Sequence, residues 1–139
     1  MFGDLGWLSR EGRSTVYRTE LGRLRVFDES DLEHGRAAAA FVGIRHPNLY
    51  PADWVGQHAG CLALHGPWVE PLPALPPFRD YVLGLVAQIT QAAAALQERG
   101  VTYGHIEKSS VGCVSEEMWG SRVVLLDRVV MTGASTANT

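Results

Sequence analysis

A few residues of this chain could do chemistry by their type and spacing. His58, Cys61 and His65 have a spacing that could suit zinc, which prefers four nitrogen and sulfur ligands. On a hairpin Cys61 and His65 would share one face, but His58 would fall in the turn and the sequence offers no evident fourth ligand. We therefore predict no metal site at these residues. His105 is a separate candidate, because an imidazole titrates at about pH 6.5 and can serve as a general base.

His105 lies within a stretch of the sequence, from Gln97 to Asp127, in which the order of the elements is informative. This stretch reads QERGVTYGHIEKSSVGCVSEEMWGSRVVLLD. Gly100 closes a helical segment, Tyr103-Gly104-His105 follows in a loop, and an apolar run leads into Asp127. This order and spacing resemble the catalytic segment of a protein kinase, in which a helix precedes the HRD loop and a strand enters DFG.

The resemblance also covers the start of the chain, which lies on the glycine-rich phosphate loop of kinases. That loop reads GxGxxGxV, and here Ser9, Glu11 and Ser14 occupy the three glycine positions. Glycines let backbone N–H groups approach phosphate oxygens, whereas side chains at these positions keep them away. Glu11 would also bring a negative charge to the place where a triphosphate lies.

Other parts of the kinase machinery are changed as well. The strand 24–27 resembles the one that carries the phosphate-pairing lysine, with Arg25 in its place. The family's HPNL turn lies at 45–49, and counting back from it puts Ala37 where the partner glutamate of that lysine belongs. Glu33 lies one turn away from Ala37, but its place in a helix-capping pattern explains it without a rescue role.

The catalytic loop departs furthest from the family. His105 stands for the catalytic Asp, Glu107 for the Lys and Ser110 for the metal-binding Asn. Asp127 matches the metal-binding Asp of DFG, although Arg128 would place a positive charge beside the ion. The resemblance therefore implies a degenerate kinase, in which Arg25 and Asp127 alone could still hold a nucleotide phosphate or Mg²⁺.

The length of 139 residues suits one domain with a real core and is too short for a complete kinase. The resemblance implies an α+β fold: a five-stranded antiparallel sheet with a helix at about Asp31–Ile44, then a long helix and a hairpin of Val111–Val114 and Val123–Leu126. In domain terms, 1–66 would be the upper lobe, 67–77 a proline-rich hinge, 78–130 a partial lower lobe and 131–139 a flexible polar tail. The initiating Met and the polar tail favour a complete natural protein.

The helix expected from Phe78 to about Arg99 suggests an interaction surface. Its main apolar stripe consists of Phe78, Tyr81, Val82, Leu85, Val86, Ile89, Ala93 and Leu96. Leu83, Ala87 and Ala94 fall outside this stripe, and a truncated lower lobe would leave them facing solvent or a partner. Four successive alanines from Ala92 to Ala95 permit close packing. We expect a homodimer or a docked partner protein at Leu83, Ala87 and Ala94.

Composition narrows the classes of function. Hydrophobic residues make up 46% and charged residues 19%, which is typical of a globular protein. A net charge of −3 without a basic run gives no support for binding nucleic acid or a membrane surface. The start lacks a signal peptide, and two cysteines make no disulfide framework, so we expect a cytoplasmic protein.

The function that the sequence favours is therefore a catalytically inactive kinase-like protein that acts as a protein-binding regulatory or scaffold module. We expect it to use no cofactor. An alternative is a regulatory domain that binds a nucleotide such as ATP with Mg²⁺ but transfers no phosphate. A third class is an active phosphotransferase with rearranged residues.

Overall fold

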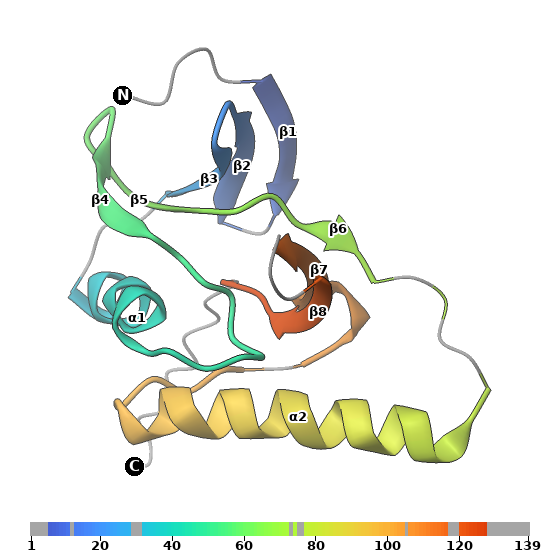
Figure 1. The fold of residues 1–139 in the computed structure, drawn as a ribbon. Helices are drawn as coiled ribbons and strands as arrows, with labels where there is room; N and C mark the ends of the chain where they lie inside the picture. Colours follow the sequence, from blue (N-terminus) through green and yellow to red (C-terminus); the bar gives the residue numbers. More distant parts are fainter. Residues whose placement is uncertain are drawn as a thin grey trace.

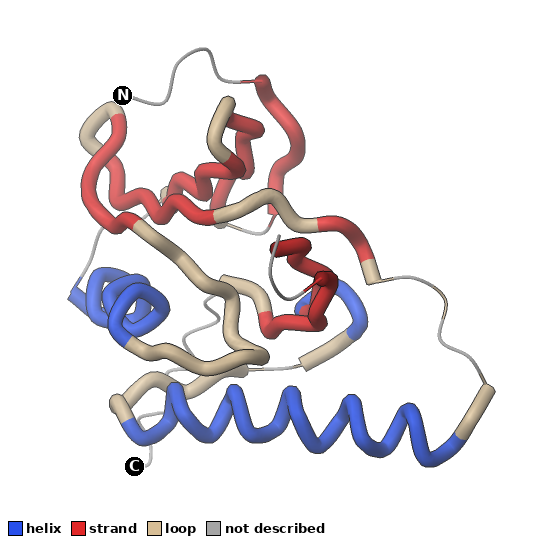
Figure 2. Tube along the Cα trace, in the orientation of Figure 1, coloured by secondary structure: helices blue, strands red, loops and turns tan. Residues whose placement is uncertain are grey.

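The computed structural model describes residues 6–11, 13–28, 32–72, 74, 77–104, 106–116 and 120–127. These residues form two antiparallel sheets and two α-helices (Figure 1). The segment 67–69 leads from the larger sheet to the smaller one, and the loop 44–53 reaches the smaller sheet, where Leu49 pairs with Leu125 (Figure 2). The predicted α+β class is confirmed.

The larger sheet has five strands in the order β1-β2-β3-β5-β4, and every neighbouring pair is antiparallel. This confirms the predicted five-stranded sheet. Along β3 successive side chains alternate between the two faces of the sheet, and both faces are largely buried. The strands are β1 (Gly6–Glu11), β2 (Ser14–Thr19), β3 (Gly22–Phe27), β4 (Trp54–His58) and β5 (Cys61–Gly66).

One helix, α1 (Leu32–Gly43), packs on this sheet against β4 and β5, as predicted. Its alanines bring the helix close to the strands, because a methyl group needs little space. Ala37 is buried in the core beside Phe41, Phe27 and Leu64. The residues of the proposed helix cap before Leu32 lie outside the described part of the chain.

The smaller sheet contains the predicted hairpin and one further strand. The hairpin strands are β7 (Val111–Glu116) and β8 (Gly120–Leu125), and β6 (Glu70–Pro71) pairs with β7 from the connector. The sequence predicted an extended connector but not this pairing. Gly112 explains it, since a side chain at this position would clash with Val69 and would hold the connector away from β7.

The long helix α2 (Arg79–Glu98) begins and ends within one residue of its predicted bounds. Gly100 follows it with φ +79, a left-handed conformation that suits glycine, as predicted for the residue that ends this helix. Ile89, Ala92 and Leu96 are buried, and α2 contacts β8. Among the described residues, no helix is long and apolar enough to span a membrane.

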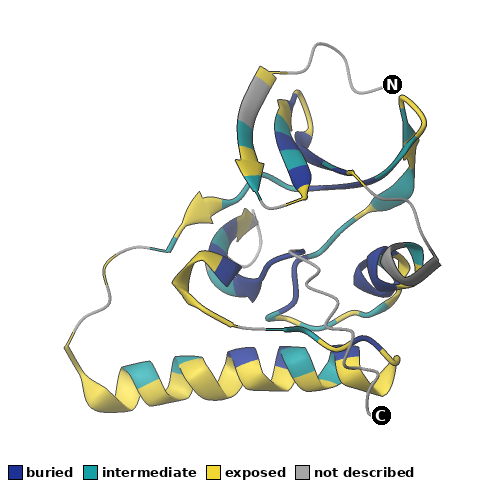
Figure 3. Cartoon of the chain, turned by 180° about the vertical axis from the view of Figure 1, so that it is seen from behind, coloured by how far each residue is buried: buried dark blue, intermediate teal, exposed yellow. Residues whose placement is uncertain are grey.

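In the first half of α2, the apolar stripe named from the sequence is largely uncovered. Phe78, Tyr81 and Val86 belong to that stripe but are 66%, 51% and 55% exposed. Figure 3 shows this half of the helix almost entirely exposed, while buried residues gather towards its other end. Helical spacing identifies an apolar face, but it does not show how far along the helix another element covers that face.

Candidate functional site

The structure brings the predicted phosphate-pairing residue, Arg25, into contact with other parts of the chain rather than with solvent. Its side chain is completely buried. All three guanidinium nitrogens donate hydrogen bonds: Nε to Asp127 Oδ1 at 3.1 Å, Nη1 to Ser14 Oγ at 2.8 Å and Nη2 to Glu11 Oε1 at 2.9 Å. Two of the glycine-position residues, Glu11 and Ser14, therefore bind the arginine that replaces the lysine.

Asp127, which follows β8, is the second predicted site residue. Its carboxylate is 1% exposed and accepts hydrogen bonds from Arg25 Nε and from Arg23 Nη2. Burial alone would raise the pKa of Asp127, but the charges of Arg23 and Arg25 outweigh burial and hold this pKa below its ordinary value. The carboxylate is therefore ionised at neutral pH.

Arg23 is the member of this site that sequence reasoning missed. It lies two residues before Arg25, so both side chains leave β3 on the same face. Its Nε donates to Tyr50 Oη at 3.4 Å, its guanidinium lies 4.6 Å from the centre of the Tyr50 ring, and Tyr50 Oη donates to the Pro67 carbonyl at 2.8 Å. Burial by itself would lower the pKa of Arg23, but Asp127 and Tyr50 raise it above its ordinary value.

We call Glu11, Arg23, Arg25 and Asp127 the central ion-pair cluster. Their two positive and two negative formal charges cancel. Glu11 comes from the end of β1, both arginines from β3, and Asp127 from the residues after β8. The cluster therefore links the five-stranded sheet to the segment that leaves the small sheet.

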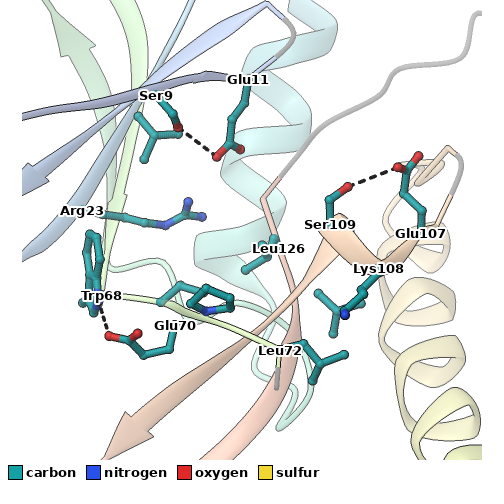
Figure 4. A pocket seen from close by; sticks show the side chains of 14 residues that line it. Ser9, Glu11, Arg23, Trp68, Glu70, Leu72, Glu107, Lys108, Ser109 and Leu126 are labelled. Atoms are coloured by element: carbon teal, nitrogen blue, oxygen red, sulfur yellow. Dashed lines mark hydrogen bonds between the residues drawn. The ribbon is translucent and has the colours of Figure 1, made fainter. Parts of the chain in front are cut away.

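A cleft of about 920 Å³ lies beside the cluster (Figure 4). Figure 4 shows Glu11 and Arg23 extending from the larger sheet, opposite Lys108 and Ser109. Trp68 Nε1 donates to Glu70 Oε2 at 2.6 Å on the connector side. The cleft is lined by Ser9, Glu11, Val16, Arg23, Trp68, Val69, Glu70, Pro71, Leu72, Glu107, Lys108, Ser109, Val111 and Leu126.

The changed residues of the loop before β7 stabilise a turn. Glu107 caps a short 3₁₀ helix, η1 (Lys108–Ser110), and its N–H donates to Ser110 Oγ at 3.2 Å. Ser109 Oγ donates to Glu107 Oε1 at 3.2 Å, and Leu126 N–H donates to the buried Ser110 carbonyl at 2.8 Å. Thus Glu107 and Ser110, at the lysine and asparagine positions, have local structural partners.

Tyr103 is a further residue that orients the site. Its hydroxyl donates to the Leu126 carbonyl at 2.9 Å, and this carbonyl immediately precedes Asp127. The loop is therefore connected to the carboxylate through the backbone. His105, considered as a general base but interpreted as a structural loop histidine, lies outside the described residues.

The remaining candidates lie elsewhere. Ala37 is in the core and cannot supply a charge to Arg25. Leu83, Ala87 and Ala94 are exposed on α2, and none of them lines the cleft. Their role as a partner interface stays a prediction.

His65, from the possible zinc set, is buried in the larger sheet. Its Nδ1 lies 3.0 Å from Asp53 Oδ1 and its Nε2 lies 2.9 Å from Thr19 Oγ1. A hydroxyl, an imidazole and a carboxylate in sequence also occur in nucleophilic triads. Here, however, Thr19 is buried and its oxygen accepts the Leu21 N–H at 3.2 Å, so we interpret the chain of contacts as structural. Within the described part of the chain, no three His, Cys, Asp or Glu residues are grouped to hold a metal ion.

Taken together, these elements have a recognisable order. A five-stranded antiparallel sheet carries one helix, an extended connector follows, and a long helix and a hairpin place an Asp at the end of the last strand. This is the arrangement of the upper lobe and the beginning of the lower lobe in a protein kinase-like fold.

Comparison with known proteins supports this assignment of the fold. No protein-family model matches the chain, and no curated protein matches it in sequence. Among solved structures, the kinase domain of PknI from Mycobacterium tuberculosis is similar, with a TM-score of 0.67 and 18% identity over 95% of this chain. A single-residue mutant of the same domain gives a TM-score of 0.66 and 19% identity over 91% of this chain. The chain thus has a protein kinase-like fold, and it covers 59% to 62% of the length of those kinase domains.

Proposed function

We propose that this chain is a kinase-like protein without phosphotransfer activity, and that it acts by binding another protein as a regulatory or scaffold module. One observation carries the proposal: Arg25 is paired with Glu11 at 2.9 Å and with Asp127 at 3.1 Å. In kinases the lysine at this position pairs with phosphates, and the Asp of DFG holds Mg²⁺. Here both residues already have internal partners of opposite charge.

The charges and contacts of the central ion-pair cluster are unfavourable for binding a nucleotide with Mg²⁺. The Glu11 carboxylate would repel a phosphate. The negative charge of Asp127, which a metal ion would need as a ligand, is already neutralised by two guanidinium groups. Ser110 Oγ accepts the Glu107 N–H, so the second metal-ligand position is also engaged. We therefore expect no cofactor in this site.

A phosphate-transfer assay tests the loss of activity. The purified chain is incubated with γ-labelled ATP, Mg²⁺ and a general protein substrate, with an active kinase domain as the positive control. We expect no label on the chain or on the substrate, because the residues that position phosphate, metal and hydroxyl act as a unit. Label that appears with wild type and disappears with Asp127→Ala would contradict the proposal.

The proposed binding surface is the exposed side of α2. Leu83 is 51% exposed, Ala87 follows it one turn later, and exposed apolar groups gather along this first half of the helix. Ala94 is exposed in the second half of the helix. Burial of a large apolar side chain in an interface contributes roughly 1.5–3 kcal/mol. We propose that this face binds a second copy of the chain or a partner protein.

Leu83→Glu tests this surface, with Gln57→Glu as a control that adds the same charge at an exposed position of β4, away from α2. Light scattering across micromolar concentrations should show a dimer for wild type and Gln57→Glu, and a monomer for Leu83→Glu. A monomeric wild type would dismiss the homodimer. If Leu83→Glu then captured a partner protein as well as wild type does, docking at this face would be dismissed too.

The alternative function, a nucleotide-binding regulatory domain, has one observation in its favour. The cleft between the lobes is still present at about 920 Å³, and its walls include Val16, Val111 and Leu126. Apolar walls of this kind suit a flat heterocycle. The two functions differ in whether Mg·ATP stabilises the folded chain.

A further inference from the structure

The contacts of the central ion-pair cluster reproduce, with protein groups, the charges that a nucleotide and its metal bring to a kinase. A kinase lysine contacts a phosphate, and here Arg25 contacts the carboxylate of Glu11. A DFG Asp contacts Mg²⁺, and here Asp127 contacts the guanidinium of Arg23. Each missing ligand is matched by an internal group that carries the same sign of charge.

We infer that Glu11 and Arg23 are built-in substitutes for the phosphate and the metal ion. Arg23 bonds Asp127 across the two lobes, and Glu11 orients Arg25 within the larger sheet so that Arg25 bonds Asp127 as well. The lobes are thereby held together in the absence of any ligand. The inference rests on the proposed function, in which no nucleotide occupies the site. It adds that the chain is closed permanently, so that its binding surface is presented without a nucleotide switch.

The two substituting residues stand at positions where a kinase has small side chains. Glu11 occupies a glycine position of the phosphate loop. Arg23 stands two residues before the lysine position, where the V-A-I-K signature has alanine. A small residue at either position would leave room for a ligand, whereas these long charged side chains reach into the cleft (Figure 4).

The hydrogen bonds of the central ion-pair cluster connect the two lobes. Arg23 and Arg25 belong to the larger sheet, while Asp127 follows β8, the last strand of the smaller sheet. Arg23 also contacts Tyr50, whose hydroxyl bonds the Pro67 carbonyl at the start of the connector. Because these groups are buried, solvent and salt screen their interactions weakly. Separation of the lobes would break the bonds of both arginines to Asp127 and leave its carboxylate without these partners.

Distance measurement between two spin labels tests the inference directly. The labels are attached at Leu21→Cys, in the exposed turn of the larger sheet, and at Thr102→Cys, an exposed position just after α2, with Cys61→Ser and Cys113→Ser removing the native thiols. We expect one narrow distance distribution without ligand, and the same distribution in millimolar Mg·ATP. A broad distribution without ligand, or one that narrows when Mg·ATP is added, would overturn the inference.

Glu11→Gln is the test variant, because Glu11 is 34% exposed and its neutral isostere should leave the chain folded. It should broaden the distribution at least twofold, whereas the exposed control Glu20→Gln should leave it unchanged. An unchanged distribution in Glu11→Gln would dismiss the role of Glu11. The result is separable from the proposed function. If the wild-type chain gave a narrow distance distribution without ligand and nevertheless bound a nucleotide, the proposed function would be defeated and the closure of the lobes would stand.

Discussion

Asp127→Asn should lower the free energy of unfolding by about 3–5 kcal/mol, because its amide cannot neutralise two buried guanidinium groups. For a domain of this size, we expect the midpoint of thermal unfolding to fall by roughly 10 °C or more. The shape of the side chain is conserved, so the loss would come from charge rather than from packing. Urea unfolding followed by circular dichroism measures the change.

Asp28→Asn provides the matched control. Asp28 also pairs with an arginine, Arg10, but these side chains are 39% and 52% exposed. Ion pairs in this environment contribute little, since water screens the charges. The control should therefore unfold close to wild type, and equal losses in the two variants would contradict the special role of the buried cluster.

The same carboxylate predicts how stability depends on pH. The pKa of Asp127 in the folded chain lies below its ordinary value of about 3.9. A depressed folded pKa means that the ion pairs stabilise fully above about pH 4 and that this contribution is lost as the pH falls through the lower, folded value. Wild type should lose more stability than Asp127→Asn in that window. Parallel losses would show that Asp127 does not carry the acid sensitivity.

Arg25→Lys should destabilise the chain by about 3 kcal/mol or more, although it restores the residue type of active kinases. A guanidinium reaches Asp127, Ser14 and Glu11 at once, and a single ammonium group cannot span these three acceptors from one position. Loss of hydrogen bonds to charged groups contributes about 1.5–3 kcal/mol each. Chemical unfolding of the variant beside wild type measures the difference.

The control for this change is Arg36→Lys, on the exposed side of α1, where the substitution should have almost no effect. We also expect Arg25→Lys to gain no binding of Mg·ATP, because Glu11 and Arg23 remain in place. A stable Arg25→Lys variant that binds nucleotide would show that Arg25 alone keeps the site closed to ligand.

The sequence predicted the order of the elements well, because each is encoded locally. The alternation in β3, the alanines of α1 and the glycine after α2 specify strands and helices without knowledge of their neighbours. Long-range pairing was less accessible. The connector strand β6 depends on the absence of a side chain at Gly112, which becomes meaningful only when Val69 lies opposite it.

The sequence drew attention to two residues of the candidate site but did not predict their contacts. Arg25 and Asp127 were identified by motif, and each was considered as a ligand for a nucleotide. Their direct pairing joins residues 102 positions apart, which no local pattern encodes. The available signal for this pairing was the two-residue spacing of Arg23 and Arg25, which puts both side chains on one face of their strand. Two arginines on one buried face would have indicated a carboxylate between them.

The most direct test of the central claim is thermal unfolding of the wild-type chain with and without Mg·ATP. A site with a Kd of about 50 μM would add about 2.7 kcal/mol of stability at roughly 5 mM ligand. We predict no change in the midpoint of unfolding, because the groups that would bind phosphate and metal are already paired with each other. A rise in the midpoint that requires Mg²⁺ and is absent in Asp127→Ala would contradict this account.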